Sequence, residues 1–221
     1  MRLAALYSGG KDSTFALYLA EQMGHDVPYL LNVRPKDGSW LFHVPNQNMV
    51  DLLAESMGKE LKVVTTEGSE DDDMKSLREL LQGLDVDGIV TGAVWSDYQW
   101  ERINVVCGDL GLIVLSPLWR KDQDMLLNEL IDSGISAMII GTYADGLSEK
   151  WLGRMLDRDA AEELRRIREK HGISVIGEGG EYESLTIDSP LQKSPLIIDS
   201  FDKEWKNMAG TMTITGAHLR S

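Results

Sequence analysis

The chain has 221 residues and a formal net charge of −14, with 43% hydrophobic and 26% charged residues. These values are typical of a soluble globular protein with one large or two small domains, and the acidic balance disfavours a nucleic-acid backbone as a partner. The single Cys107 excludes an internal disulfide and a Cys-x-x-Cys site, and the four histidines show no metal-ligand spacing. No apolar run is long enough to span a membrane, and the first expected strand begins at Arg2 or Leu3. A leader peptide then has no room, so we expect a cytoplasmic protein with no membrane partner.

Short apolar runs rich in β-branched residues alternate with helical patterns through most of the chain. We expect strands near 3–7, 29–33, 62–65, 88–91, 113–115 and 137–140. We expect helices at 13–23, 46–57, 72–81, 101–109 and 122–132. The alternation predicts βαβ units with right-handed crossovers and a parallel sheet, which is an α/β fold. Ligands of such sheets bind beyond the carboxyl ends of the strands.

The pattern changes after about residue 141. Helical spacing at 151–155 and 158–170 precedes an apolar run at 173–176, which we interpret as a strand, and two more strands are expected near 196–199 and 211–215. We therefore expect two domains, one of residues 1–144 and a smaller α+β domain of residues 145–221. The acidic run 70–73 is interpreted as the first turn of a helix capped by Ser69.

The first strand is joined to the first helix by Ser-Gly-Gly-Lys-Asp-Ser, residues 8–13. A strand that turns on two glycines into a helix presents free backbone N–H groups at the positive end of the helix dipole, where phosphate binds. The loop is not a Walker A sequence, because Ala5 stands where its first glycine is required and Asp12 where a serine or threonine is required. The candidate nucleotide-binding residues are Ser8, Gly9, Gly10, Lys11, Asp12 and Ser13. An ordinary glycine turn is the alternative.

Asp12 would repel a bare phosphate group. Its position is explained by a Mg²⁺ ion, a hard cation that binds carboxylate and phosphate oxygens together, and Lys11 adds a positive charge. A role as a helix N-cap is the alternative for Asp12.

Two further polar segments are expected near the phosphate loop. Residues 177–184, Gly-Glu-Gly-Gly-Glu-Tyr-Glu-Ser, gather carboxylates that repel one another unless a metal or a cationic substrate lies between them. Residues 92–99 and Arg102 follow the end of a predicted strand. The candidate substrate-binding residues are Ser96, Asp97, Tyr98, Gln99, Arg102, Glu178, Gly179, Gly180, Glu181, Tyr182 and Glu183. The alternatives are a turn with solvated glutamates, and the capping of a helix by Ser96 and Asp97.

These segments, together with residues 107–111 and 116–119, occur in an order and at a spacing that resemble the diphthine–ammonia ligase family. This family is a branch of the N-type ATP pyrophosphatases of the PP-loop superfamily. The phosphate loop alone marks the superfamily, whereas Glu-Gly-Gly-Glu-Tyr-Glu with Ser-Asp-Tyr-Gln marks the branch. Ser184 stands where threonine is more usual, and Trp100-Glu101 replaces a more basic pair. The resemblance extends to about Asp199 without the C-terminal extension of many eukaryotic members, which implies a short archaeal-type form.

The resemblance implies a Rossmann-like N-terminal domain, of the adenine nucleotide alpha hydrolase-like type, that binds ATP and Mg²⁺. It implies that ATP activates the diphthine carboxylate of translation elongation factor two as an acyl-adenylate, with loss of pyrophosphate. Ammonia then displaces AMP and leaves diphthamide. Lys11, Asp12 and Glu181 are the expected catalytic residues, and Asp12 is the expected metal ligand.

The resemblance also implies how the acceptor is recognised. Diphthine carries a trimethylammonium group, for which carboxylates and a nearby aromatic ring are suitable partners. Glu178, Glu181, Tyr182 and Glu183 offer this combination. Cys107 lies inside a predicted helix without the features of an activated thiol, so free ammonia or a separate partner is expected to supply the nitrogen. A homodimer is a further expectation.

Other functions stay open from the sequence. The same ATP chemistry could amidate a small, cobalamin-related carboxylic acid, or the chain could be a nucleotide-binding sensor without turnover. Sulfur transfer to tRNA is disfavoured by the single cysteine and the acidity. His43 is either a ligand of nucleotide or substrate or a surface histidine, and Arg120 either pairs with pyrophosphate or forms a structural ion pair.

Overall fold

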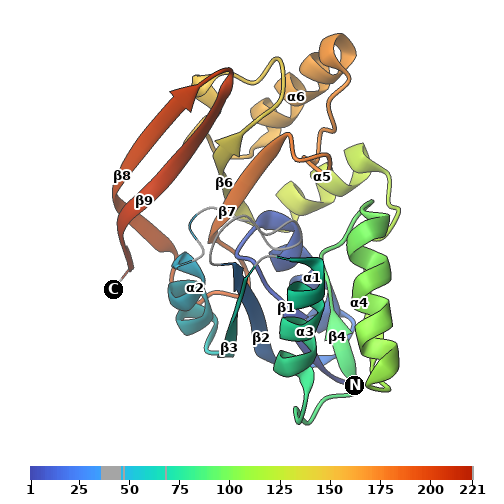
Figure 1. Ribbon diagram of the computed structural model, residues 1–221. Helices are drawn as coiled ribbons and strands as arrows, with labels where there is room; N and C mark the ends of the chain where they lie inside the picture. The colour runs from blue at the N-terminus through green and yellow to red at the C-terminus, as the bar shows by residue number, and fades with distance from the viewer. Residues whose placement is uncertain (36–45, 47, 68, 221) are drawn as a thin grey trace.

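The computed structural model describes residues 1–35, 46, 48–67 and 69–220 and contains two β-sheets with helices around them (Figure 1). The N-terminal half of the chain forms one sheet, and the C-terminal part forms the other. His43 lies outside the described residues.

The first sheet has five parallel strands in the order β3-β2-β1-β4-β5. Their bounds are β1 Arg2–Leu6, β2 Asp26–Pro35, β3 Glu60–Thr66, β4 Gly88–Val90 and β5 Ile113–Leu115. Each strand overlaps the range that the apolar runs predict, so the α/β class and the parallel sheet are confirmed.

Helices cover both faces of this sheet. They are α1 Lys11–Gln22, α2 Met49–Met57, α3 Glu70–Leu81 and α4 Asp97–Asp109. Alternate residues of a strand point to opposite faces. Leu3 and Ala5 therefore share a core with α1 and α2, whereas Ala4 shares a second core with α3 and α4. Burial on both faces explains why the strands are apolar runs without a polar side.

The order of the strands reverses between β1 and β4. From β1 the chain continues to β2 and β3 on one side, and then returns to place β4 on the other side of β1. A crevice for ligands forms at such a switch point, beyond the carboxyl ends of the strands. The loops that follow β1 and β4 are residues 7–10 and 91–96, so two of the predicted polar segments meet here.

The second sheet has four antiparallel strands in the order β7-β6-β9-β8. The remaining elements are α5 Gln123–Asp132, β6 Ser136–Thr142, the short 3₁₀ helix η1 Glu149–Trp151, α6 Arg158–His171, β7 Tyr182–Asp188, β8 Leu196–Lys206 and β9 Ala209–Leu219. Strands β8 and β9 form a long hairpin that extends from the body of the protein (Figure 1). The smaller α+β part predicted for the C-terminal region is confirmed.

Two strand predictions for this region are wrong. We expected residues 137–140 as a sixth parallel strand, but β6 pairs antiparallel with β7 and β9, because an apolar run fits either sheet equally well. Residues 173–176 do not form a strand, and side chains satisfy two of their backbone groups: Ser174 N donates to Glu181, and Val175 O accepts from Tyr182. Strand β7 begins at Tyr182, within the polar segment of residues 177–184.

The helices expected at 13–23, 46–57, 72–81, 101–109, 122–132 and 158–170 are confirmed with shifted ends, whereas the helix expected at 151–155 is wrong. The Ser69 side chain accepts from the backbone N–H of Asp72 and caps α3. Helix α6 carries an exposed i,i+4 ion pair of Arg166 and Glu162 at 3.3 Å. In place of a helix at 151–155 there is only η1. Among the described residues, no helix has the length and apolar character needed to cross a bilayer.

Candidate active site

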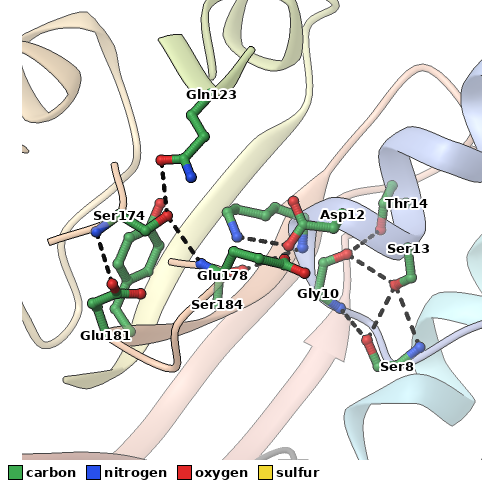
Figure 2. Close-up of polar contacts among 12 residues, drawn as sticks. Ser8, Gly10, Asp12, Ser13, Thr14, Gln123, Ser174, Glu178, Glu181 and Ser184 are labelled. Atoms are coloured by element: carbon green, nitrogen blue, oxygen red, sulfur yellow. Dashed lines mark hydrogen bonds and ion pairs between the residues drawn. The ribbon is translucent and has the colours of Figure 1, made fainter. Parts of the chain in front are cut away.

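The loop between β1 and α1 is held closed by its own serines (Figure 2). Ser8 N donates to Ser13 Oγ at 3.3 Å, and Ser13 Oγ donates to Gly10 O at 3.1 Å. Gly9 has a φ of +80°, a conformation that favours glycine, and a Cβ there would make a tight contact of 3.2 Å with the Leu53 side chain. Gly10 is the N-cap of α1. The loop therefore leads directly into the start of a helix, whose positive dipole end suits a phosphate group.

Strand β7 lies directly against this loop, although it comes from the other end of the chain. Thr186 N donates to Gly9 O at 2.8 Å, and Lys11 N donates to Ser184 Oγ at 3.2 Å. The hydroxyl groups of Thr14 and Thr186 are 2.8 Å apart. The second sheet thus fixes the position of the phosphate loop.

Lys11 is a buried cation in this loop, with 3% of its surface exposed. Its Nζ lies 2.7 Å from Asp12 Oδ2 and 5.0 Å from the centre of the Tyr182 ring. Burial lowers the pKa of Lys11, but the Asp12 carboxylate and Tyr182 raise it, so that it lies above its usual range. Lys11 therefore carries its charge at neutral pH.

Asp12 has an oxygen that fits a metal ion. Gly10 has the N-cap position, so the alternative capping role of Asp12 is wrong. Asp12 Oδ1 is buried and has no hydrogen-bond partner among the described residues. A buried oxygen without a hydrogen-bond donor is unfavourable, and this oxygen is a suitable ligand for Mg²⁺. No three His, Cys, Asp or Glu side chains of the described residues converge on one metal position, so phosphate oxygens and water would complete the coordination.

Glu178 links the two predicted substrate segments. Its Oε1 accepts from the backbone N–H groups of Trp95 at 2.8 Å and Ser96 at 2.9 Å. Burial raises the pKa of Glu178, and the charge of Asp12 raises it further, although the backbone hydrogen bonds and Lys11 lower it. Figure 2 shows Glu178 between Asp12 on one side and the turn that contains Glu181 on the other.

Glu181 braces the turn that precedes β7. Its Oε1 accepts from Ser174 N at 2.7 Å (Figure 2). Its Oε2 accepts from Gly179 N at 2.8 Å. Gly180, between Gly179 and Glu181, has a φ of +79°. These bonds give Glu181 a structural position, and its catalytic role stays a prediction.

Tyr182 and Glu183 begin β7 and differ in their surroundings. Tyr182 is 2% exposed, and its hydroxyl donates to Val175 O at 2.9 Å. Burial raises the pKa of Glu183 to about 7, while Lys11 lowers it and Asp12 raises it. No hydrogen bond or ion pair from the described residues holds the Glu183 carboxylate. Glu183 can therefore gain or lose a proton near neutral pH.

The segment after β4 packs on the phosphate loop. A Cβ on Gly92 would lie 2.7 Å from Ser13 N, so the two loops touch through their backbones. Ser96 caps α4 by accepting from Gln99 N at 3.3 Å, and this confirms the capping alternative for Ser96. Asp97 pairs with Arg120 at 2.5 Å.

Arginine and aromatic side chains of this segment and of residues 119–120 form a cation–aromatic surface. The guanidinium carbon of Arg102 lies 3.4 Å from the centre of the Tyr98 ring. Arg120 lies 4.9 Å from the ring of Trp95 and 5.0 Å from that of Trp119. Arg120 thus has the structural ion pair with Asp97, and its contact with pyrophosphate stays a prediction.

An open cavity of about 440 Å³ lies between the start of α4 and the turn before β7. Its walls are Trp95, Ser96, Gln123, Gly172, Ile173, Ser174, Glu178, Gly179 and Glu181. The predicted residues Tyr98, Gln99 and Arg102 do not line it. Sequence reasoning missed Trp95, Gln123 and Ser174 as wall residues. Trp95 lies within the predicted polar segment of residues 92–99, whereas no local sequence pattern points to Gln123 or Ser174 as site residues.

The fold and the site define a class of protein. A glycine turn enters a helix at the switch point of a parallel sheet, beside a buried lysine and an aspartate with an unsatisfied oxygen. This arrangement is that of an α/β protein that binds the phosphates of a nucleotide. Residues 1–114 match the diphthamide synthase N-terminal domain, and residues 122–219 match the diphthamide synthase C-terminal domain. The chain belongs to the diphthamide synthase family, and it is an ATP-dependent ligase.

Curated relatives support this placement. The diphthine–ammonia ligase of Danio rerio is 40% identical over 223 residues, which cover 90% of this chain and 87% of that protein. The diphthine–ammonia ligase of Homo sapiens is 39% identical over 224 residues, which cover 90% of this chain and 84% of that protein. The predicted subunit of a tRNA methyltransferase from Methanocaldococcus jannaschii covers 86% of this chain and 98% of its own, but a TM-score of 0.47 and 14% identity are too low to carry an argument.

Proposed function

We propose that this chain amidates the diphthine carboxylate of translation elongation factor two, with ATP and ammonia as co-substrates. The names of the relatives support the acceptor and the nitrogen donor. The observation that carries the ATP chemistry is the phosphate loop, with Lys11 and the unsatisfied oxygen of Asp12 at its helix start.

In the first step, the acceptor carboxylate attacks the α phosphorus of ATP. The bond between the α phosphorus and the bridging oxygen breaks, pyrophosphate leaves, and an acyl-adenylate forms. The loop of residues 8–13 holds the phosphates at the start of α1, and Lys11 offsets their charge. A Mg²⁺ ion bound by Asp12 would neutralise negative charge on the phosphate oxygens. No base is required, since a carboxylate is already a nucleophile at neutral pH.

In the second step, ammonia attacks the acyl carbon of the adenylate. The carbon–oxygen bond to AMP breaks, AMP leaves with that oxygen, and the nitrogen loses a proton to give the amide. Glu183 is our candidate to accept this proton, because its carboxylate is buried, lies near Lys11 and Asp12, and has a pKa of about 7. Cys107 is fully buried, and burial raises its pKa, so it is unsuited to release ammonia from glutamine.

The two parts of the chain divide the work in this proposal. Residues 1–144 hold ATP, and residues 145–221 provide the acceptor segment with Glu178 and Glu183, along with Ser184, which supports the phosphate loop. A cytoplasmic setting, an archaeal origin and a homodimer remain part of the proposal.

A product analysis tests this function. The protein is incubated with Mg·ATP, an ammonium salt and elongation factor two bearing diphthine, and AMP, pyrophosphate and the mass of the factor are followed. We expect AMP and pyrophosphate together with the mass change for replacing a hydroxyl by an amino group. Formation of AMP without that mass change would mean that the factor is not the acceptor. Small carboxylic acids would then be tested in its place. An absence of AMP with every acceptor would contradict the proposal and favour a sensor.

A further inference from the structure

The aromatic ring that the sequence offers for a cationic acceptor is not available. The Tyr182 ring is 2% exposed, Lys11 Nζ already lies 5.0 Å from its centre, and its hydroxyl is bonded to Val175 O. A ligand cannot reach this ring without displacing Lys11. An aromatic contact to the acceptor must therefore come from another residue.

Trp95 is the aromatic residue that lines the cavity of about 440 Å³. Its side chain is 41% exposed, although it is held in place. The indole Nε1 donates to Lys121 O at 3.0 Å, and the backbone N–H donates to Glu178. The Arg120 guanidinium lies 4.9 Å from the ring centre. Trp95 is thus a preorganised wall, and little side-chain entropy is lost when a ligand binds against it.

Two carboxylates place negative charge in the same cavity. Glu178 and Glu181 both line it. Glu181 uses both oxygens to accept backbone N–H groups, and Glu178 uses Oε1 for two more. Arg120 does not cancel this charge, because its own partner is Asp97 at 2.5 Å. The cavity therefore carries fixed negative charge beside an exposed indole.

This combination selects among cations. An aromatic ring and a carboxylate attract an organic cation through charge and ring contact, and this attraction needs no N–H group on the ligand. The carboxylate oxygens are already largely occupied by backbone donors, which lowers the gain for a primary ammonium that seeks acceptors. A quaternary ammonium does not need these oxygens as acceptors, since it has no hydrogen to donate. Glu178 connects this cavity to the phosphate loop, because its charge interacts with Asp12 and Lys11.

We propose that the cavity binds the quaternary ammonium group of the acceptor against Trp95, with Glu178 and Glu181 supplying the negative charge. The inference rests on the proposed function, and it assigns a site to a group that does not react. A fixed cation would hold the acceptor so that its carboxylate reaches the nucleotide bound at the phosphate loop.

Small probes test the cavity without turnover. Binding of choline is compared with binding of 3,3-dimethylbutanol, the neutral molecule in which carbon replaces the quaternary nitrogen. We expect choline to bind more tightly, and Trp95→Leu to weaken it by roughly three- to thirty-fold. Trp95→Phe retains a ring and should bind choline within a few-fold of wild type, which keeps the test decisive if the leucine variant does not fold. Trp100→Leu is the matched control, because Trp100 stacks on Trp119 outside the cavity, and choline binding should not change.

Equal binding of the two probes would overturn the proposal, and so would choline binding that is unchanged in Trp95→Leu.

A second test uses the acceptor itself. Trp95→Leu should raise KM for diphthine-bearing factor and leave KM for ATP near the wild-type value. An unchanged acceptor KM, despite weaker choline binding, would show that the acceptor does not use this cavity and would also overturn it. If wild-type protein forms no amide, the proposed function fails, whereas the choline comparison still decides whether the cation site exists.

Discussion

The backbone N–H of Lys11 donates to the side-chain oxygen of Ser184, 173 residues further along the chain, at 3.2 Å. The phosphate loop is therefore completed by a strand of the second sheet. Strand β7 begins with Tyr182 and Glu183. In the proposed function, β7 therefore connects the nucleotide held by the loop with the acceptor held by the second sheet.

Removal of the Ser184 hydroxyl should weaken ATP binding. Ser184→Ala leaves the buried N–H of Lys11 without its acceptor, and such a group costs about 1–3 kcal/mol. We expect a higher KM for ATP and a lower midpoint in urea unfolding. Ser184→Thr keeps a hydroxyl and should remain near wild type. Equal behaviour of the alanine and threonine variants would mean that this bond does not support the loop.

A methyl group at Gly92 should distort the phosphate loop. The added Cβ of Gly92→Ala would lie 2.7 Å from Ser13 N and 2.8 Å from the carbonyl carbon of Asp12. Because both are backbone atoms, the loop must move, and we expect a loss of about 1–3 kcal/mol in stability together with a large loss of AMP formation.

Gly108→Ala is the control for this variant. Gly108 lies in α4, and a Cβ there meets no atom within 4 Å. Alanine should stabilise the helix by up to about 1 kcal/mol without changing turnover. Thermal unfolding and AMP release measured on both variants separate a local clash from a general sensitivity to alanine.

Loss of the Asp12 carboxylate charge should abolish turnover. Asp12→Asn keeps the shape of the side chain but removes the charge that fits Mg²⁺ and that pairs with Lys11. We expect a decrease in kcat of about a hundred-fold or more, by analogy with the loss of one preorganised electrostatic group. The dependence of the rate on Mg²⁺ concentration is measured alongside circular dichroism. Normal turnover in a folded Asp12→Asn variant would remove the metal-binding role.

Glu183 should make stability fall as pH rises. Burial raises its pKa from the ordinary 4.5 to about 7 in the folded protein. The folded state then binds more protons than the unfolded state between these values, so stability decreases with increasing pH across this window. The contribution is present below pH 4.5 and is lost, by up to about 3 kcal/mol, once pH exceeds 7.

Glu183→Gln isolates this contribution. The amide does not ionise, so the variant should be more stable than wild type at pH 8, and the difference should shrink as the pH approaches 5. Urea unfolding across this range provides the measurement. A difference that does not depend on pH would contradict the assignment.

The sequence predicts those features that depend on neighbouring residues. Short segments of sequence are enough to predict the loop of residues 8–13, the alternation of strands and helices, and the cap at Ser96. Contacts between distant residues were missed. The bond between Lys11 and Ser184 has no local signature, because strand pairing is set by tertiary packing.

The turn before β7 shows the same limit. Residues 173–176 have the apolar composition of a strand, yet the Glu181 and Tyr182 side chains take the backbone bonds that a neighbouring strand would supply. The position of Tyr182, buried under Lys11 rather than open to a ligand, likewise depends on how β7 lies on the phosphate loop. Trp95 takes over the aromatic role in our account for this reason.

In the proposed reaction, the acceptor carboxylate attacks the α phosphorus of ATP. The most direct test labels that carboxylate with a heavy oxygen isotope and determines by mass spectrometry where the label goes after a single turnover with ammonia. Our account predicts that the AMP phosphate gains one labelled oxygen while the new amide keeps the other. Formation of amide with unlabelled AMP would contradict the acyl-adenylate and with it the proposed mechanism.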